Sequence, residues 1–262
     1  MSDDRLTGDH VVVTGGVRGI GRGIAVRLAR AGASVTVFDM DVDAAAATAD
    51  AIREEGVEAL VLEVDVTDRE AVSTAFDEAE NELGPVSGLA NNAGIQRAVP
   101  ALETTEADLD DHFAVNVKGA VFCAQEAASR MIERGTEGGI VTIASVAAVR
   151  PFPGQGAYAA SKAGILAFSK ALAKEVGDDG LRVNVINPGT VDTPMVQQWL
   201  AENAEQTDKS EEELLEDALE NHTLDRMGRP EEIGNVVAML LSAEGAWITG
   251  EAINVDGGYT NE

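Results

Sequence analysis

The sequence has little of what marks secreted, membrane-spanning or nucleic-acid-binding proteins. It contains one cysteine, Cys123, which cannot form a disulfide within the chain, and this favours a reducing, cytoplasmic compartment. The first ten residues, MSDDRLTGDH, begin with acids and lack an apolar core, so they do not predict a signal peptide. The most apolar stretch, residues 140–149, contains Thr142 and Ser145 and is too short to cross a bilayer, which needs about 20 apolar residues.

Basic residues are scarce as well. Asp and Glu number 46 against 19 Lys and Arg, a formal charge of −27, and no lysine precedes Lys118. Nucleic acids and anionic membranes are polyanions that bind basic surfaces, so we expect neither as a partner. The charge far exceeds the magnitude of about 2–8 that solubility needs, and it indicates adaptation to a saline cytoplasm, where salt screens the repulsion between acids. Ordinary acidic solubility is the alternative interpretation.

The 262 residues alternate short apolar runs with amphipathic helical stretches, without a Pro/Ser-rich linker or an internal repeat. This alternation predicts one domain over residues 1–262: an α/β, Rossmann-type, doubly wound sheet of seven parallel strands with helices on both faces. The predicted strands are His10–Val13, Ser34–Phe38, Leu60–Val64, Val86–Asn91, Gly139–Ala144, Leu181–Ile186 and Ala252–Val255.

Periodicity and capping residues predict the helices between these strands. One pattern runs from Ile20 and ends at Gly32, and a second follows Asp68 as N-cap. A capping box of Thr105 and Asp108 opens a helix that we expect to continue to Arg134. Further helices are predicted from Tyr158 to Glu175 and from Pro230 onward.

Residues 193–229 depart from the alternation because they contain no predicted strand. They carry Trp199 and an acidic run around Glu211, Glu212 and Glu213. Long excursions from a compact sheet are often functional, so we expect a lid over the substrate site; a pair of solvated surface helices is the alternative.

A glycine-rich loop, TGGVRGIG, directly follows the first predicted strand and opens a helix. Its glycines, Gly15, Gly19 and Gly21, allow the backbone to approach a pyrophosphate at the helix N-terminus. The second strand ends in Asp39, whose carboxylate can accept both adenosine ribose hydroxyls and would repel a 2′-phosphate, so NAD is favoured over NADP. Arg18 could meet a 2′-phosphate, but we expect it over the adenine side or in solvent.

Acid–base chemistry is indicated by Ser145, Tyr158 and Lys162. Ser145 ends the fifth strand, at the edge where open α/β sheets place their ligands. Tyr158 and Lys162 share one face of a predicted helix, and we expect the ammonium to lower the pKa of the tyrosine, which could then exchange protons with an alcohol or ketone. Ser145 would hold the substrate oxygen. A Tyr-x-x-x-Lys pair alone is usually a surface pair, but this tyrosine is one of only two in the chain.

These motifs resemble the classical short-chain dehydrogenase/reductase family, and the resemblance runs from Val11 to Tyr259. The family's TGxxxGIG motif is met by residues 14–21 and its NNAG motif by residues 91–94. The resemblance implies a catalytic tetrad of Asn116, Ser145, Tyr158 and Lys162, in which Lys162 also binds the nicotinamide ribose and Asn116 supports a proton-relaying water. It further implies that Asp65 binds the adenine amino group, that Pro188 and Gly189 form a turn beside the nicotinamide, and that Thr193 holds its carboxamide.

The motifs and the resemblance together predict a cofactor site. Its residues are Thr14, Gly15, Arg18, Gly19, Ile20, Gly21, Asp39, Asp65, Val66, Asn92, Ala93, Gly94, Tyr158, Lys162, Pro188, Gly189 and Thr193.

The remaining polar residues predict no metal site. His10, His112 and His222 lack metal-ligand spacing and a cysteine partner. Cys123 is expected to be a small buried residue within a helix rather than a nucleophile.

The substrate pocket is expected to draw on the segment after NNAG, on residues 147–155 and on residues 193–229. The candidate substrate residues are Gln96, Arg97, Ala147, Arg150 and Gln155. NNAGIQ resembles D-3-hydroxybutyrate dehydrogenases, but those enzymes place a histidine and a lysine where this chain has Ala147 and Gln155, which disfavours hydroxybutyrate. Arg97 or Arg150 could bind a sugar-acid carboxylate, or both could face solvent or pair with surface acids.

We therefore expect an NAD-dependent dehydrogenase that oxidises a polyol, sugar or sugar-acid hydroxyl. The alternatives are reduction of 3-oxoacyl thioesters with NADPH, which Asp39 opposes, an NAD-binding sensor or structural subunit, and a lyase or epimerase that uses bound NAD transiently. The resemblance also implies a homotetramer, formed through residues 105–134, 158–175 and 252–259.

Overall fold

Seven short strands form one parallel sheet in the order β3-β2-β1-β4-β5-β6-β7. The computed structural model describes residues 4–42 and 44–261, so residues 1–3, 43 and 262 of the predicted domain lie outside it. The strand order reverses between β1 and β4, which makes the sheet doubly wound, as predicted. The strands are β1 (His10–Thr14), β2 (Ser34–Asp39), β3 (Ala59–Glu63), β4 (Gly88–Asn91), β5 (Gly138–Ile143), β6 (Leu181–Pro188) and β7 (Ala252–Val255).

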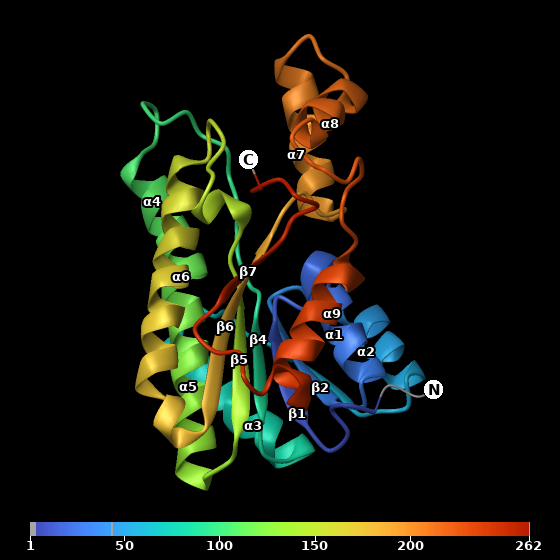
Figure 1. Ribbon diagram of the computed structural model, residues 1–262, viewed down its shortest axis with the longest axis vertical. Coiled ribbons are helices and arrows are strands. Elements are labelled where there is room, and N and C mark those ends of the chain that lie inside the picture. Colours follow the sequence, from blue (N-terminus) through green and yellow to red (C-terminus); the bar gives the residue numbers. More distant parts are fainter. Residues whose placement is uncertain (1–3, 43, 262) are drawn as a thin grey trace.

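Helices cover both faces of the sheet (Figure 1). The helices are α1 (Gly19–Arg30), α2 (Ala45–Glu54), α3 (Arg69–Leu83), α4 (Glu106–Phe113), α5 (Ala120–Arg134), α6 (Gly156–Glu175), α7 (Pro194–Gln206), α8 (Glu211–Leu219) and α9 (Pro230–Leu241). Helices α1, α2 and α9 lie on one side, and α3, α5 and α6 lie on the other. No helix of the described residues is long and apolar enough to span a membrane.

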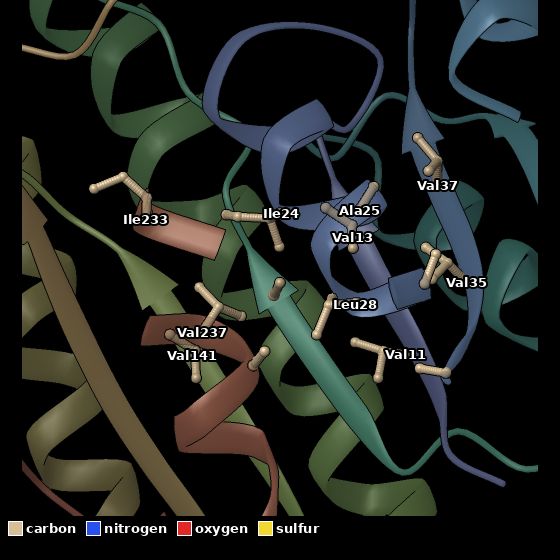
Figure 2. Close-up of a cluster of buried hydrophobic side chains, with 14 of the residues drawn as sticks. Val11, Val13, Ile24, Ala25, Leu28, Val35, Val37, Val141, Ile233 and Val237 are labelled. Carbon is tan, nitrogen blue, oxygen red and sulfur yellow. The ribbon is translucent and has the colours of Figure 1, made fainter. Parts of the chain in front are cut away.

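The alternation of side chains along β1 divides the core between the two faces of the sheet. Val11 and Val13 of β1 belong to the cluster that contains α1 and α9, whereas Val12 belongs to the cluster under α3 and α5. Figure 2 shows the first cluster, where Ile24 of α1 and Val237 of α9 point toward the sheet. The three valines of β1 and these two helix residues are fully buried or nearly so, as expected for a parallel sheet covered on both faces.

Six of the seven strands differ from their predicted bounds by one or two residues, and two of these differences exclude a buried valine from the strand. The strand predicted for residues 86–91 begins at Gly88, and the one predicted for residues 60–64 is Ala59–Glu63. Val86 and Val64 are buried and apolar like strand residues, but each lies just outside the parallel pairing of its strand. Burial alone therefore extends an apolar pattern beyond the hydrogen-bonded strand.

The helix predicted from Thr105 to Arg134 is correct at both ends but not in its middle. The N-terminal capping box is present, with Asp108 N donating to Thr105 Oγ1 at 3.2 Å and Thr105 N donating to Asp108 Oδ2 at 2.9 Å. Between α4 and α5, however, residues Ala114–Gly119 form a π-helix. Such a segment inserts extra backbone into a helix, often at functional sites, and here it contains Asn116.

Candidate active site

The glycine-rich loop lies against the turn that follows β4. Asn92 Nδ2 donates to Thr14 O at 3.0 Å and to Gly15 O at 2.9 Å, and Thr14 Oγ1 accepts from Asn92 N and Ala93 N. A Cβ on Gly21 would lie 2.0 Å from Gly15 O, so the turn has no room for a side chain there. The TGGVRGIG and NNAG segments, predicted separately, therefore form one structure.

The N-terminus of α1 fits an anionic ligand. The described part of the chain offers no side-chain cap to this helix end, and its first turn contains no acid although the chain has 46. The backbone reaches it through Gly15 and Gly19, with φ of +63° and +53°. Backbone N–H groups and the helix dipole therefore remain available to a pyrophosphate, so the residues present fit a dinucleotide.

Asp39 lies at the end of β2, beside this loop. Its Oδ2 accepts from Val17 N at 3.2 Å and its Oδ1 accepts from Asp41 N at 3.1 Å, and the residue is half-buried. Arg18 is 70% exposed and its Nη1 lies 3.8 Å from Asp41 Oδ2. Asp39, which would repel a 2′-phosphate, is therefore held by the loop backbone. Arg18, which would attract one, points toward solvent.

Other predicted cofactor residues surround the loop from neighbouring segments. Asp65 Oδ1 accepts from Thr67 N at 2.9 Å and from Thr67 Oγ1 at 2.8 Å, and the adjacent Val66 is buried. Thr193 caps α7 by accepting from Val196 N, and its side chain would lie 3.4 Å from a Cβ placed on Gly19. The start of residues 193–229 is thus packed against the glycine-rich loop.

The turn after β6 completes the predicted cofactor residues. Gly189 N donates to Val255 O at 3.1 Å, and a Cβ on Gly189 would lie 2.8 Å from Asp256 Cα. Pro188 is the last residue of β6 and is buried. This turn is therefore packed closely against the segment that follows β7.

The four residues of the implied catalytic tetrad come together at the carboxyl end of β5. Ser145 shares a side-chain hydrogen bond with Tyr158, and its Oγ also accepts from Ala147 N at 3.1 Å. Lys162 Nζ lies 5.8 Å from the centroid of the Tyr158 ring and donates to Ile143 O at 2.9 Å. Tyr158 and Lys162 are 9% and 5% exposed.

Asn116 reaches the site from the π-helix and acts through the backbone of its neighbours. Its Oδ1 accepts from Ile95 N at 2.8 Å, and its Nδ2 donates to Ile95 O and to Ser161 Oγ, each at 2.9 Å. A Cβ on Gly94 would lie 3.1 Å from Asn116 Oδ1 and 3.2 Å from Lys162 Nζ, so these two polar atoms face the same small space. Asn116 therefore ties the turn after β4 to α6.

The pKa of Tyr158 differs from the expectation based on the sequence. Burial raises the pKa of this phenol, and the hydrogen bond from Ser145 opposes that shift. Burial also lowers the pKa of Lys162 to about 8. A nearby ammonium favours a phenolate, but loss of solvation disfavours both charged forms, and here the loss of solvation has the larger effect.

The candidate substrate residues lie around this group. Arg97 is exposed and its Nη1 donates to Asp111 Oδ2 at 2.5 Å. Arg150 Nη1 donates to Tyr259 O at 2.7 Å, and its guanidinium lies 4.6 Å from the centroid of the Tyr259 ring. Both arginines thus contact other residues of the chain.

The other three candidates lie in the segment between β4 and α4 and in the segment between β5 and α6. Ala147 is 2% exposed and packs with Tyr158. Gln155 precedes α6 and forms an isolated parallel β-bridge with Val99. Gln96 is half-buried in the turn after β4.

His112, for which the sequence predicted no metal-binding role, lies beside Tyr158. It is fully buried, with its ring centroid 6.3 Å from that of Tyr158 in an edge-on arrangement. Its Nδ1 is 2.6 Å from Asp108 O and its Nε2 accepts from Arg97 N at 3.2 Å. The sequence feature that could have indicated its place near the site is its position four residues before Asn116, on the same predicted helix. Residues 4–42 and 44–261 contain no group of three His, Cys, Asp or Glu side chains arranged to hold a metal.

The whole chain is similar to known enzymes. The family described as Enoyl-(Acyl carrier protein) reductase matches residues 15–260. L-2,3-butanediol dehydrogenase of Corynebacterium glutamicum is 36% identical over 249 residues, which cover 94% of this chain and 96% of the relative. A 3-oxoacyl-(acyl-carrier-protein) reductase of Staphylococcus aureus is 35% identical over 248 residues, with the same coverage of 94% and 96%.

The solved structures agree with the fold. The structure of L-sorbose reductase from Gluconobacter frateurii, complexed with NADPH and L-sorbose, superposes with a TM-score of 0.93 at 31% identity and covers 100% of both chains.

Proposed function

The chain belongs to the short-chain dehydrogenase/reductase family and is an oxidoreductase that acts on CH–OH groups, and we propose that it oxidises a secondary alcohol of a polyol, sugar or sugar acid with NAD. The observation that carries this proposal is the grouping of two nearly buried residues of α6, Tyr158 and Lys162, with Lys162 Nζ 5.8 Å from the centroid of the Tyr158 ring and Ser145 following β5. The uncapped N-terminus of α1 lies across the same edge of the sheet.

In the proposed mechanism, the chain's own residues bind and deprotonate the alcohol. Ser145 donates a hydrogen bond to the substrate oxygen, and Tyr158 accepts the hydroxyl proton. When bound, the nicotinamide ring supplies the hydride acceptor and, in its oxidised form, a positive charge. Positive charge beside a buried phenol favours the phenolate, which opposes the upward shift that burial causes in the pKa of Tyr158.

Lys162 and Asn116 support this proton transfer. Lys162 is held by Ile143 O and, by the family resemblance, would also bind the nicotinamide ribose. Asn116 holds Ile95 and Ser161, and Ser161 Oγ donates to Tyr158 O at 2.7 Å, so it positions both the turn after β4 and the helix that carries the tyrosine.

The preference for NAD rests on Asp39. Its carboxylate lies beside the glycine-rich loop, where it would bind the ribose hydroxyls and repel a 2′-phosphate. Arg18 points toward Asp41 rather than across the loop. The L-sorbose reductase was solved with NADPH, so the family as a whole does not decide the cofactor.

The substrate proposal is supported by two relatives whose names specify small hydroxylated compounds, 2,3-butanediol and L-sorbose. Reduction of 3-oxoacyl thioesters is the second candidate, because the Staphylococcus aureus relative is named for that activity at nearly the same identity. Residues 193–229, which form α7 and α8, are proposed as the lid over this substrate.

A direct assay separates these candidates. We would measure NADH formation in molar salt with NAD or NADP, offering polyols, aldoses, sugar acids and 3-hydroxyacids. Turnover of one carbohydrate class with NAD supports the dehydrogenase. If the protein only reduces ketones, and only with NADPH, the 3-oxoacyl thioester reductase becomes the favoured function. That result would also show that Asp39 does not determine the choice of cofactor. Consumption of substrate without net NADH would indicate a lyase or epimerase.

Replacement of Tyr158 with Phe tests whether the chain is an enzyme rather than a sensor. The substitution removes only the hydroxyl, so turnover should fall by about 10²- to 10⁴-fold, the usual contribution of a general acid–base group. NAD binding, measured by fluorescence titration, should be retained. Undiminished activity in this variant would remove Tyr158 from the mechanism.

Assembly and location are proposed as well. The family resemblance supports a homotetramer through the α4–α5 region, α6 and the C-terminal strand. Trp247, which precedes β7 in the chain, is fully exposed in the single chain, as expected for an apolar residue that another subunit covers. A reducing cytoplasm is supported by the single cysteine, Cys123, which cannot form a disulfide within the chain.

A further inference from the structure

The chain's C-terminal segment returns across the carboxyl end of the sheet. After β7 it passes between the side of the molecule that carries α6 and the side that carries α7 and α8 (Figure 1). Tyr259 lies in this segment, three residues before the end of the chain, yet it is only 4% exposed. A terminal aromatic residue this deeply buried must be held by contacts from other segments.

The Tyr259 ring contacts three side chains from two different segments. The Phe152 ring is stacked on it with centroids 5.1 Å apart, and the Arg150 guanidinium lies 4.6 Å from its centroid. Both residues belong to the loop that joins Ser145 to Tyr158. On the other segment, the His222 ring lies 5.2 Å from the Tyr259 ring. His222 follows α8, near the end of residues 193–229.

The backbone of the C-terminal segment is also built into this position. Leu224 N donates to Gly257 O at 2.8 Å, which attaches the segment directly to the end of residues 193–229. A Cβ on Gly258 would lie 2.4 Å from Thr223 Oγ1. The Asp256 carboxylate accepts from Gly258 N and from Thr260 N and Oγ1, and these bonds lower its pKa.

We propose that Tyr259 is a positioning residue that fastens the α7–α8 segment to the loop between Ser145 and Tyr158, and so sets the opening through which substrate reaches the catalytic tyrosine. Thr193 holds the beginning of the α7–α8 segment against the glycine-rich loop, and Tyr259 holds its end. The consequence for substrate binding rests on the proposed function, whereas the fastening itself does not.

The same contacts assign a different role to Arg150 from the one expected from the sequence. Its guanidinium is bonded to Tyr259 O and stacked on the Tyr259 ring, so it holds the C-terminal segment. A carboxylate substrate would have to compete with these contacts for Arg150. The fastening therefore favours an uncharged alcohol over a sugar acid as the substrate of this site.

Amide hydrogen exchange measured by mass spectrometry tests the fastening without any substrate. Tyr259→Leu keeps an apolar side chain but removes the aromatic and cation–π contacts, so exchange across residues 193–229 should accelerate by about tenfold or more. Tyr259→Phe keeps both ring faces and should retain slow exchange. Peptides from β1 and α5 should be unaffected in both variants. Unchanged exchange of residues 193–229 in Tyr259→Leu, or an equal acceleration over the whole chain, would overturn the proposal.

The effect on substrate is measured with 2,3-butanediol and NAD. In Tyr259→Leu the KM for the diol should rise by about threefold or more while kcat changes less, and the affinity for NAD should be that of the wild type. A fall in kcat alone would contradict the positioning role. If the wild type does not oxidise 2,3-butanediol, that result bears on the proposed function, and the exchange experiment still decides whether Tyr259 fastens the segment.

Discussion

Among single residues, Lys162 shows how burial governs the chemistry of the site. Its ammonium lies beside the Tyr158 ring with Ile143 O as its hydrogen-bond acceptor, and burial lowers its pKa to about 8. A lysine that changes protonation near the working pH can exchange a proton with its surroundings, which an ordinary surface lysine cannot do. The tyrosine and the lysine therefore act as a pair whose charges depend on what else occupies the site.

Replacing Lys162 with Met should change how stability depends on pH. In the unfolded chain the lysine pKa returns to 10.5, so between pH 8 and that value the unfolded state binds an additional proton and the wild-type free energy of unfolding rises with pH, by about 3 kcal/mol at most. Lys162→Met lacks this contribution. Its stability relative to the wild type should be greatest below pH 8 and should decline toward pH 10.5. Urea unfolding of both proteins at several pH values measures this, and a constant difference would contradict it.

Among the elements, α9 illustrates a helix that depends on a distant side chain. It packs on α1, and its C-terminal carbonyls are bonded by Arg182 of β6. The guanidinium donates to Leu240 O and Leu241 O, and also to Ser242 O and Gly245 O. A positive charge at a helix C-terminus also interacts favourably with the helix dipole. Arg182 thus connects the edge of the sheet to the helix that covers it.

Removal of this cap should destabilise the protein. Arg182→Met removes the side-chain donor to Leu240 O and Leu241 O, whereas Ser242 O and Gly245 O still accept from backbone N–H groups, so the free energy of unfolding should fall by about 2–3 kcal/mol in urea titrations. The control is Arg53→Met, which removes an exposed i,i+3 ion pair with Asp50 and one exposed hydrogen bond to Ala59 O, and it should change stability by less than about 1 kcal/mol. Equal effects of the two substitutions would show that the cap contributes nothing specific.

For the whole molecule, the net charge of −27 is the dominant physical property. The chain has 46 acids and 19 bases, so ion pairs such as Arg97 with Asp111 or Lys209 with Asp217 can neutralise only a minority of the acids. The remaining carboxylates repel one another more strongly in the folded state than in the expanded unfolded chain. Added salt should relieve that repulsion, because the Debye length falls from about 10 Å at 0.1 M to about 3 Å at 1 M.

We therefore expect the Tm to rise by about 10 °C between 0.1 M and 2 M NaCl, which for a chain of this size corresponds to roughly 3 kcal/mol. A variant in which the exposed acids of α8 and its end are neutralised should gain less from salt. Those acids are Glu211, Glu212, Glu216 and Glu220, each changed to Gln. Thermal unfolding followed by circular dichroism measures both. A Tm that does not depend on salt would favour ordinary acidic solubility.

Much of the fold and part of the site could be predicted from sequence because the signals are local. The glycine-rich turn and the capping box at Thr105 were confirmed, and each depends on residues a few positions apart. The doubly wound parallel sheet was also confirmed, because the alternation of apolar runs and helical stretches is visible along the chain, although its pairings join residues as distant as Val11 and Gly88. The π-helix around Asn116 was missed, since an extra residue in a helical turn leaves no periodic pattern. The roles of the tetrad remain predictions that the Tyr158 and Lys162 variants test.

The sequence by itself determined the family and the reaction class, because motif spacing within one strand, loop or helix can be recognised without knowledge of the fold. Only the tertiary structure decided what those residues contact. Arg150 and Tyr259 are 109 positions apart, and Arg182 and Leu240 are 58 apart, so no local pattern links them. The direction of the Tyr158 pKa shift likewise depends on burial by distant segments, and solvation is a property of the folded molecule rather than of the chain.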